Sequence, residues 1–211
     1  MKIYRGVFSP IQVNTYIITG NERDCIIIDC GCYGETEERK LEEMLASRGL
    51  NPVMLIGTHC HLDHVFGNRF MLERYGLRPR FHEGDSYNYR NAPKLSLMFG
   101  LSMDAPPEPE GYLAEGDVIT AAGITLKVIH VPGHSPGGIA LYSADDSVVF
   151  TGDALFAGSI GRSDLPGGDH EQLMANIREK LFTLPPETVI YPGHGPESII
   201  GEEMQRNPFF T

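Results

Sequence analysis

Three histidines and one aspartate fall within six residues of the segment 58–64, which reads Thr-His-Cys-His-Leu-Asp-His. His59 and His61 stand two apart at the end of an apolar run, and in an extended chain their side chains point the same way. Asp63 and His64 follow, at the predicted start of a helix. Imidazole nitrogens and a carboxylate suit zinc, iron or manganese better than calcium or copper(I). A polar helix cap is the alternative, but imidazoles this close would repel one another on protonation unless a metal or another partner held them.

Three further candidates share one local context, in which a polar residue follows an apolar strand and a glycine. They are His134, Asp153 and His194. Because glycine permits close backbone approach, strand ends that converge on one edge would present all three side chains to one site. Taken singly, each is a weak signal, since a lone histidine at a strand end is usually a surface or hydrogen-bonded residue. With the first segment they complete a set of five histidines and two aspartates, which suits two adjacent metal ions sharing one carboxylate and a bridging water.

The composition is that of a globular protein, with 41% hydrophobic and 21% charged residues in a chain of 211. We expect a single domain over residues 1–211. The 17 basic and 28 acidic residues give a net charge of −11, which argues against nucleic acid or a membrane surface as partner. No stretch has the character of a secretory signal or a membrane span. The four cysteines lack redox or zinc-ribbon spacing, so a reducing cytoplasm is the expected location; the oligomeric state stays open.

Apolar patterning predicts a group of strands with accompanying helices in each half of the chain. In the first half we expect strands at 2–8, 12–19, 25–29, 52–56 and 79–81, and helices at 36–48 and 62–75. In the second half we expect strands at 124–131, 139–142, 147–150 and 188–191, and a long helix opened by Asp169. This order fits two sheets packed together and flanked by helices.

Residues 84–111 are predicted to form an insertion near the site. It begins with a helix over 85–99, interrupted by Pro93, and ends in the proline-rich loop 105–111. Its apolar side chains are either a lid or wall of the site or an ordinary packing stripe of a helix. Cys60 lies between two candidate ligands, but on an extended segment its side chain faces away from them, which predicts packing rather than ligation.

These motifs resemble the metallo-β-lactamase superfamily, and more closely its glyoxalase II-like (hydroxyacylglutathione hydrolase-like) branch. The resemblance is carried by Ile28-Asp29, the T-H-x-H-x-D-H signature at 58–64, Pro-Gly-His-Ser-Pro-Gly at 132–137, Thr-Gly-Asp at 151–153, Gly161-Arg162 and Gly-His-Gly at 193–195. It implies an α+β fold, the αββα four-layer sandwich, in which two mixed sheets are flanked by helices and the metal site lies at one edge. It also implies two divalent metal ions, with zinc as the first expectation and iron or manganese as alternatives.

The resemblance assigns the seven candidate ligands. His59, His61 and His134 would bind the first metal ion, Asp63, His64 and His194 the second, and Asp153 would bridge them. The chain departs from a true glyoxalase II, because only 17 residues follow His194 and the C-terminal helical domain of that enzyme is not expected. Arg162 is a candidate for binding a substrate carboxylate, since its planar fork suits that group. An ion pair with Asp164 or Asp169 is the alternative role.

The activity that the resemblance implies is hydrolysis of a small-molecule thioester, such as S-(2-hydroxyacyl)glutathione or a related acyl thiol. A metal-bridging hydroxide would attack the carbonyl, and Asp63 would both bind metal and orient the hydroxide. The alternative is a mononuclear iron persulfide dioxygenase, in which His59, His134 and Asp153 would hold one iron(II). A β-lactamase, a nuclease and a non-catalytic binding module fit the motifs and the acidic charge less well.

Overall fold

A computed structural model describes residues 1–21 and 23–211 of the protein. Within these residues, the first half of the chain builds a six-stranded sheet in the order β1-β2-β3-β4-β5-β6. Its strands are β1 (Lys2–Phe8), β2 (Val13–Thr19), β3 (Asp24–Ile28), β4 (Asn51–Ile56), β5 (Pro79–Phe81) and β6 (Gly111–Tyr112). The pairs β1·β2 and β2·β3 are antiparallel, whereas β3, β4, β5 and β6 pair in parallel, so this sheet is mixed.

The second half of the chain builds another six-stranded sheet, in the order β14-β13-β10-β9-β8-β7. Its strands are β7 (Val118–Ala121), β8 (Ile124–His130), β9 (Ile139–Ser143), β10 (Val148–Gly152), β13 (Val189–Pro192) and β14 (Ser198–Ile199). Only β10 and β13 pair in parallel among these neighbours. A separate hairpin joins β11 (Leu155–Phe156) to β12 (Ser159–Ile160).

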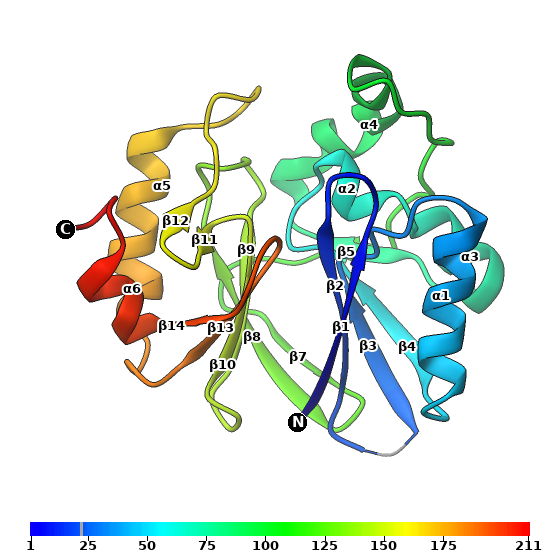
Figure 1. The fold of residues 1–211 in the computed structure, drawn as a ribbon, viewed down its shortest axis with the longest axis horizontal. Helices are drawn as coiled ribbons and strands as arrows, with labels where there is room; N and C mark the ends of the chain where they lie inside the picture. The colour runs from blue at the N-terminus through cyan, green and yellow to red at the C-terminus, as the bar shows by residue number, and fades with distance from the viewer. Residues whose placement is uncertain (22) are drawn as a thin grey trace.

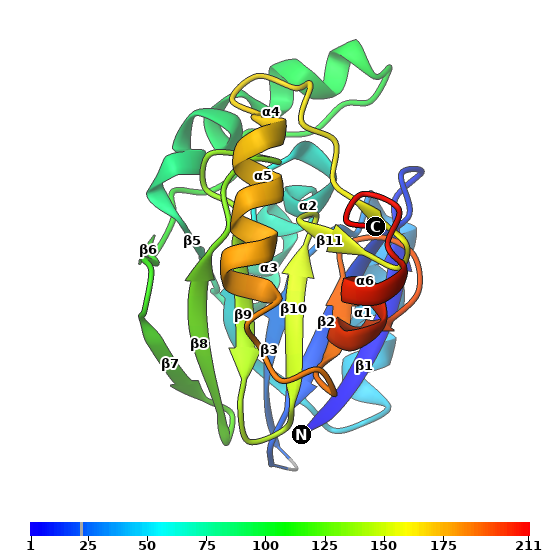
Figure 2. The same cartoon turned by 90° about the vertical axis from the view of Figure 1, so that its left-hand side faces the viewer.

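The helices cover the outer faces of the two sheets. They are α1 (Glu35–Ala46), α2 (Leu62–Val65), α3 (Asn68–Tyr75), α4 (Ser86–Met98), α5 (His170–Asn176) and α6 (Ile200–Arg206). Figure 1 shows α1 and α3 outside the first sheet, with α2 and α4 at the upper edge of the molecule. Figure 2 shows α5 and α6 in front of the second sheet. The predicted αββα sandwich of two mixed sheets is therefore confirmed.

The central strands are apolar on both faces because both faces are covered. In β3, Ile26 and Ile28 belong to the core between the sheets, whereas Ile27 packs with Leu41 of α1 on the outer side. Each of these side chains is fully buried, as expected of a strand covered on both sides. None of the helices in the described ranges has the length and hydropathy of a membrane span.

Two helix predictions need correction. The helix expected over 62–75 is split into α2 and α3, because the N–H of Gly67 bonds to the carbonyl of Cys30. A Cβ atom at position 67 would lie 2.5 Å from the sulfurs of Cys30 and Cys32, so tertiary packing sets this break. The helix expected to be interrupted at Pro93 instead runs through it, as α4, after a 3-10 turn at Glu83–Asp85.

One helix cap agrees with the sequence prediction, whereas several short elements were not predicted. The side chain of Asp169 accepts a hydrogen bond from the N–H of Gln172 and caps α5, as predicted. The strands β11, β12 and β14 and the helix α6 were not expected from the sequence. Each of these three strands has only two residues, which is too short for any hydrophobic period to appear.

Candidate metal centre

The seven candidate ligands meet at one edge of the sandwich because each follows the end of a strand. The loop after β4 carries His59 and His61, and α2 directly after it carries Asp63 and His64. In the other half, the loop after β8 carries His134. Asp153 follows β10, and His194 follows β13. Because β10 and β13 are parallel neighbours, their carboxyl ends present Asp153 and His194 to the same place.

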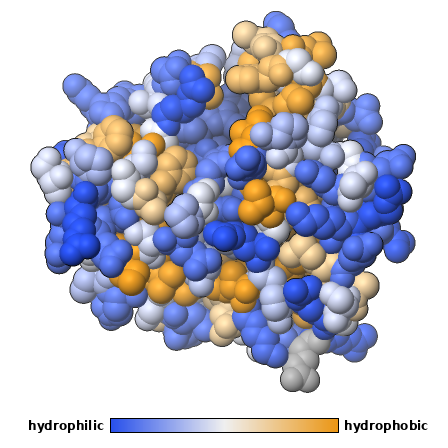
Figure 3. All heavy atoms as spheres, in the orientation of Figure 1, coloured by the Kyte–Doolittle hydropathy of each residue, from blue (hydrophilic) through white to orange (hydrophobic). Residues whose placement is uncertain are grey.

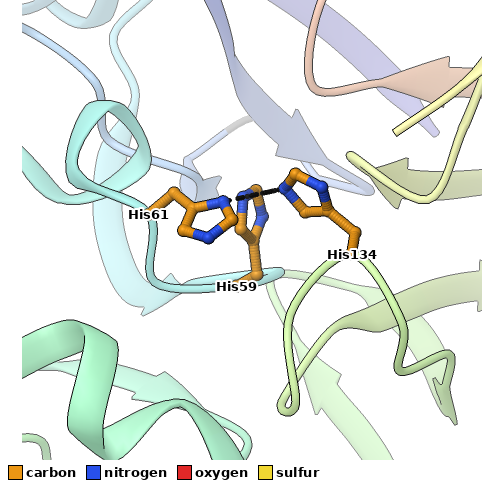
Figure 4. Close-up of side chains that lie close together, drawn as sticks. All are labelled: His59, His61 and His134. Carbon is orange, nitrogen blue, oxygen red and sulfur yellow. Dashed lines mark hydrogen bonds between the residues drawn. The ribbon is translucent and has the colours of Figure 1, made fainter. Parts of the chain in front are cut away.

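His59, His61 and His134 form the first group of converging side chains. The Nδ1 atom of His61 lies 2.8 Å from Nε2 of His134, which lies 3.2 Å from Nε2 of His59. Figure 4 shows the three rings turned toward one another from the two loops that carry them. One atom from each residue lies within 4.8 Å of the others, an arrangement that fits a three-nitrogen metal site.

Asp63, His64 and His194 form the second group. The Nε2 atom of His194 lies 3.1 Å from Oδ2 of Asp63, and Nε2 of His64 lies 3.7 Å from the same oxygen. Asp153 lies between the two groups, with Oδ1 3.4 Å from His64 Nε2 and Oδ2 3.6 Å from His134 Nε2. Oδ2 of Asp153 is also 3.5 Å from Nε2 of His194. One carboxylate thus faces both groups.

Hydrogen bonds orient three of the histidine rings and so fix which nitrogen of each of the three faces the cluster. The Nδ1 atom of His134 lies 2.6 Å from the carbonyl oxygen of Arg162, and Nδ1 of His194 lies 3.2 Å from that of Gln12. A carbonyl only accepts, so each Nδ1 donates a proton to it and each Nε2 is turned toward the cluster. In the same way, Nδ1 of His59 donates to the hydroxyl of Thr58, whose own proton goes to a carboxylate.

The donor atoms of this cluster fit divalent metal ions. Nε2 of His64 and Oδ1 of Asp153 are buried, yet neither has a hydrogen-bond partner in the described chain. Buried polar atoms normally have partners, because leaving one unpaired costs about 1–3 kcal/mol. Nitrogen and carboxylate oxygen are ligands for zinc, iron and manganese. The site therefore meets the chemical requirements of the two ions that the sequence predicts.

Two histidines of the first group, His59 and His61, are neutral near pH 7. Burial, together with the adjacent His64 and His134, lowers the pKa of His59 well below its usual value. Burial and the neighbouring His134 lower the pKa of His61 to about 3. Neutral imidazole is the form that binds a metal ion, so these two residues need lose no proton to do so.

The second group carries paired charges instead. Burial disfavours the charged form of His64, but the carboxylates of Asp153, Asp29 and Asp63 outweigh it and raise the pKa of His64. Burial opposes ionisation of Asp63 as well, yet the neighbouring His64 and His194 hold its pKa below the usual value. A bound cation would replace the positive charge that a protonated His64 otherwise supplies to these carboxylates.

Asp29 positions the first ligand loop, although the sequence presented it only as part of a motif. Its Oδ1 accepts from the N–H of Thr58 at 2.7 Å, and its Oδ2 accepts from the Thr58 hydroxyl at 2.6 Å. The same Oδ2 lies 3.0 Å from Nδ1 of His64. Asp29 therefore holds the start of the segment 58–64 and lies against the Nδ1 edge of the His64 ring.

Asp85 is a supporting residue that sequence reasoning missed. It is fully buried and accepts from the N–H of Cys60 at 2.8 Å, the hydroxyl of Ser135 at 2.9 Å and the N–H of Gly137 at 2.7 Å. Burial raises the pKa of the Asp85 carboxyl, although the three hydrogen bonds act in the opposite direction. The only local signal is an acidic residue ahead of a helix, which reads equally well as a cap.

The His194 loop is held against β2. The side-chain amide of Asn14 donates to the carbonyls of Pro192 and Gly195, and the hydroxyl of Tyr16 donates to that of Pro192. A Cβ atom at Gly193 would lie 2.1 Å from Oδ1 of Asp153. Only glycine therefore allows this loop to pass so close to the candidate bridging carboxylate.

Arg162 takes part in the ion pair that the sequence left open as an alternative. Its guanidinium donates to both oxygens of Asp164, at 2.8 and 2.7 Å. Both side chains are more than half exposed. Arg162 also lines the cleft beside the centre, so its role toward a substrate stays a prediction.

A cleft of about 400 Å³ opens beside the candidate metal centre. Its lining includes five candidate ligands: His61, Asp63, His134, Asp153 and His194. Leu95 and Phe99 of the insertion line it, whereas Tyr89 and Ala92 of the same helix are buried in a core cluster. Residues of the segment 84–111 therefore lie both in the wall of the cleft and in a packed cluster, and a role of this segment at a working site stays a prediction. Cys60 is buried in that core cluster as well, on packing contacts as expected.

Fold and site together define a class of protein. The family model described as the metallo-beta-lactamase superfamily matches residues 9–194. The chain belongs to this superfamily, as its motifs predicted. Within the superfamily, the curated relatives that match the chain include one from Bacillus subtilis that is named as a probable metallo-hydrolase and another that is named as a hydroxyacylglutathione hydrolase.

Particular relatives place the chain more closely. Hydroxyacylglutathione hydrolase GloC of Haemophilus influenzae is 36% identical, over 96% of this chain and 95% of that protein. The crystal structure of BLEG-1 B3 metallo-beta-lactamase superposes with a TM-score of 0.92 at 32% identity, over all of both chains. The crystal structure of TTHA1623 in a di-iron-bound form has a TM-score of 0.87 at 39% identity, over 98% of this chain and 99% of that one.

Proposed function

We propose that the protein is a dinuclear metal-dependent hydrolase of acyl thioesters. The observation that carries this proposal is the position of Asp153, whose two oxygens face His64 on one side and His134 on the other. A carboxylate shared by two groups of ligands is the arrangement that two-metal hydrolysis needs. Zinc is the first candidate metal, with iron and manganese as alternatives.

Bound divalent cations would supply an ionised water as nucleophile near neutral pH and positive charge for the developing oxyanion. The residues of the chain prepare the site for this chemistry. Asp63 lines the cleft and lies within 3.1 Å of His194, so its carboxylate can accept and orient the proton of an attacking water. The Arg162 carbonyl holds the ring of His134 with Nε2 toward the cluster, and the hydrophobic lining excludes bulk water from the reacting group.

Thioesters are favoured as substrates by the similarity to a protein named as a hydroxyacylglutathione hydrolase. A solved relative is named as a β-lactamase, so a β-lactam is the appropriate competing substrate. The zinc-loaded protein should hydrolyse acyl thioesters, and the free thiol that is released measures the rate. It should cleave a chromogenic cephalosporin much more slowly. Faster turnover of the cephalosporin would overturn the proposal.

A mononuclear iron enzyme is the second candidate function. The relative solved in a di-iron-bound form, 39% identical to this chain, supports iron as the metal but not a single ion, so this candidate depends on three of the ligands alone. His59, His134 and Asp153 lie close enough to form the two-histidine, one-carboxylate face of a mononuclear iron(II) dioxygenase. Nε2 of His134 lies 3.2 Å from Nε2 of His59 and 3.6 Å from Oδ2 of Asp153. Oxygen uptake by the iron-loaded protein with a persulfide, in the absence of thioester hydrolysis, would favour that function.

A further inference from the structure

We propose that the cleft binds the apolar acyl chain of a thioester whose thiol carrier bears no carboxylate, and that Asn88 gives this ligand a neutral hydrogen bond. The inference rests on the proposed thioesterase function and narrows its substrate class. It separates the protein from an enzyme that recognises glutathione through its charged groups. Three observations support it: the apolar walls, the pairing of the cation in the lining, and the state of Asn88.

Apart from the candidate ligands, Asn88 and Arg162, the described residues that line the cleft are apolar. They comprise Ile11, Leu62, Leu95, Phe99, Phe156, Leu165 and Pro166. These residues come from the β1–β2 turn, from α2, from the insertion, from β11 and from the segment after β12, so several parts of the chain form the walls. A volume of about 400 Å³ lies within the usual range for small-molecule sites, which are mostly apolar with a few placed polar groups. An acyl chain next to the reacting carbonyl is the occupant that fits such walls.

The apolar surface continues from the cleft onto the end of α4. Phe99 lines the cleft and is still 54% exposed, and its neighbours Leu97 and Met98 are more exposed. Figure 3 shows hydrophobic residues gathered over α4 at the top of the molecule. A chain too long for the cleft would therefore leave it along an apolar surface.

Recognition of glutathione would require cations for its carboxylates. Among the described residues that line the cleft, Arg162 is the one basic side chain apart from the histidines, and its guanidinium already donates to both oxygens of Asp164. The net charge of −11 adds a general repulsion toward anionic ligands. A carrier without carboxylates meets neither obstacle.

Asn88 lines the cleft and is 4% exposed, and its Nδ2 has no hydrogen-bond partner in the described chain. A buried amide without an internal partner is available to a ligand, and rotation about χ2 turns either end of the amide to the cleft. The amide is uncharged, so it suits a carbonyl, amide or hydroxyl of the ligand rather than a carboxylate.

The test uses non-hydrolysable thioethers, so that binding is measured apart from chemistry. S-hexyl-N-acetylcysteamine has one neutral amide, whereas S-hexylglutathione has two carboxylates and an ammonium. By calorimetry on the zinc-loaded protein, we expect the first compound to bind at least about tenfold more tightly, with affinity rising about threefold to fourfold per methylene from butyl to hexyl. Tighter binding of the glutathione compound, or affinity independent of chain length, would overturn the inference.

Variants locate the contacts. Phe99→Ala should abolish most of the gain from each methylene, whereas Val118→Ala, at an exposed residue of β7 outside the cleft, should leave it unchanged. Asn88→Leu should weaken S-hexyl-N-acetylcysteamine by about fivefold, the scale of one hydrogen bond. Asp164→Asn should release Arg162 and strengthen S-hexylglutathione alone. Equal effects of Phe99→Ala and Val118→Ala, or no effect of Asn88→Leu, would contradict these assignments.

The proposed function and the proposed ligand class are distinguished by different outcomes. If the zinc-loaded protein hydrolyses no thioester but still binds the uncharged thioether by chain length, the proposed function is wrong and the apolar cleft stands. If it hydrolyses S-lactoylglutathione faster than any N-acetylcysteamine thioester and binds S-hexylglutathione more tightly, the function stands and this inference is wrong.

Discussion

The carboxylate of Asp85 accepts a hydrogen bond of 2.8 Å from the backbone N–H of Cys60, the residue between the candidate ligands His59 and His61. The same carboxylate binds Ser135 and Gly137, which follow His134. Asp85 thus joins the two loops that carry the first group of ligands, although it belongs to neither. Ligand geometry at this centre depends on a residue that does not face the cluster.

Replacing Asp85 with asparagine should weaken metal binding. The variant has one acceptor oxygen for three donors, and an unpaired buried donor costs about 1–3 kcal/mol. We expect metal affinity to fall about 10- to 100-fold, as for other residues that orient metal ligands. Chelator competition measures the affinity. Asp117→Asn is the matched control, since Asp117 caps an exposed turn at Ala114; similar losses in both variants would contradict the positioning role.

Gly193→Ala tests how closely the His194 loop approaches Asp153. The added methyl group would lie 2.1 Å from Oδ1 of Asp153 and 2.8 Å from a carbon of His64, so one of these side chains must move. We expect the variant to fold but to hold fewer metal ions per chain, as measured by elemental mass spectrometry. Gly111→Ala, where a methyl group meets nothing within 4 Å, should keep the full metal content. Full occupancy in Gly193→Ala would show that the centre tolerates the displacement.

Asp63→Ala should lower turnover far more than thermal stability. The carboxylate lines the cleft and contacts His194, so its loss removes both a candidate ligand and the group that orients water. We expect kcat to fall by at least about 100-fold, which is the usual loss when one group that stabilises a transition state is removed. Thiol release and thermal unfolding are measured on the same metal-loaded samples. Losses of the same proportion in both would count against a catalytic role.

The pair between Arg80 and Glu110 fastens the end of the insertion to β5 and supplies a pH test. The Arg80 guanidinium donates to both oxygens of Glu110 at 2.9 and 3.2 Å and lowers the pKa of that carboxyl. Because the pKa of Glu110 is lower in the folded protein, the ion pair stabilises the fold at pH values above the usual pKa of 4.5. This stabilisation is lost as the pH falls through the lowered pKa. Because both side chains are over a third exposed, the pair contributes only about 0.5 kcal/mol.

Urea unfolding of chelator-treated protein measures this contribution. Glu110→Gln should reduce the free energy of unfolding slightly near neutral pH, and this difference should disappear once the pH falls below the lowered pKa of Glu110, where the wild-type carboxyl is also protonated. Added salt should shrink the difference at neutral pH. A difference that grew in acid would show that the pair is not its source.

The sequence predicted most of the candidate centre, because the signals are local. Four of the seven residues lie within 59–64, and Asp153 and His194 follow apolar strands directly. Asp85 and Asn88 could not be found in this way. The partners of Asp85 lie 25 to 52 residues away, and the missing partner of Asn88 is a property of the folded protein alone.

The fold shows the same division. Strands such as β3 are apolar on both faces, so their burial between two layers follows from composition. The break between α2 and α3 depends on contact of Gly67 with Cys30 and Cys32, which no helical period records. The course of α4 through Pro93 depends likewise on tertiary packing, since Tyr89 and Ala92 are held in the core beneath it.

The metal content of protein purified without added metal or chelator tests the proposed dinuclear centre most directly. Elemental mass spectrometry on a sample of known concentration gives the identity and the number of ions per chain. We predict two divalent ions, with zinc first, and loss of thioester hydrolysis when a chelator removes them. A single iron per chain, with no second ion taken up from excess metal, would contradict the dinuclear centre and favour the dioxygenase.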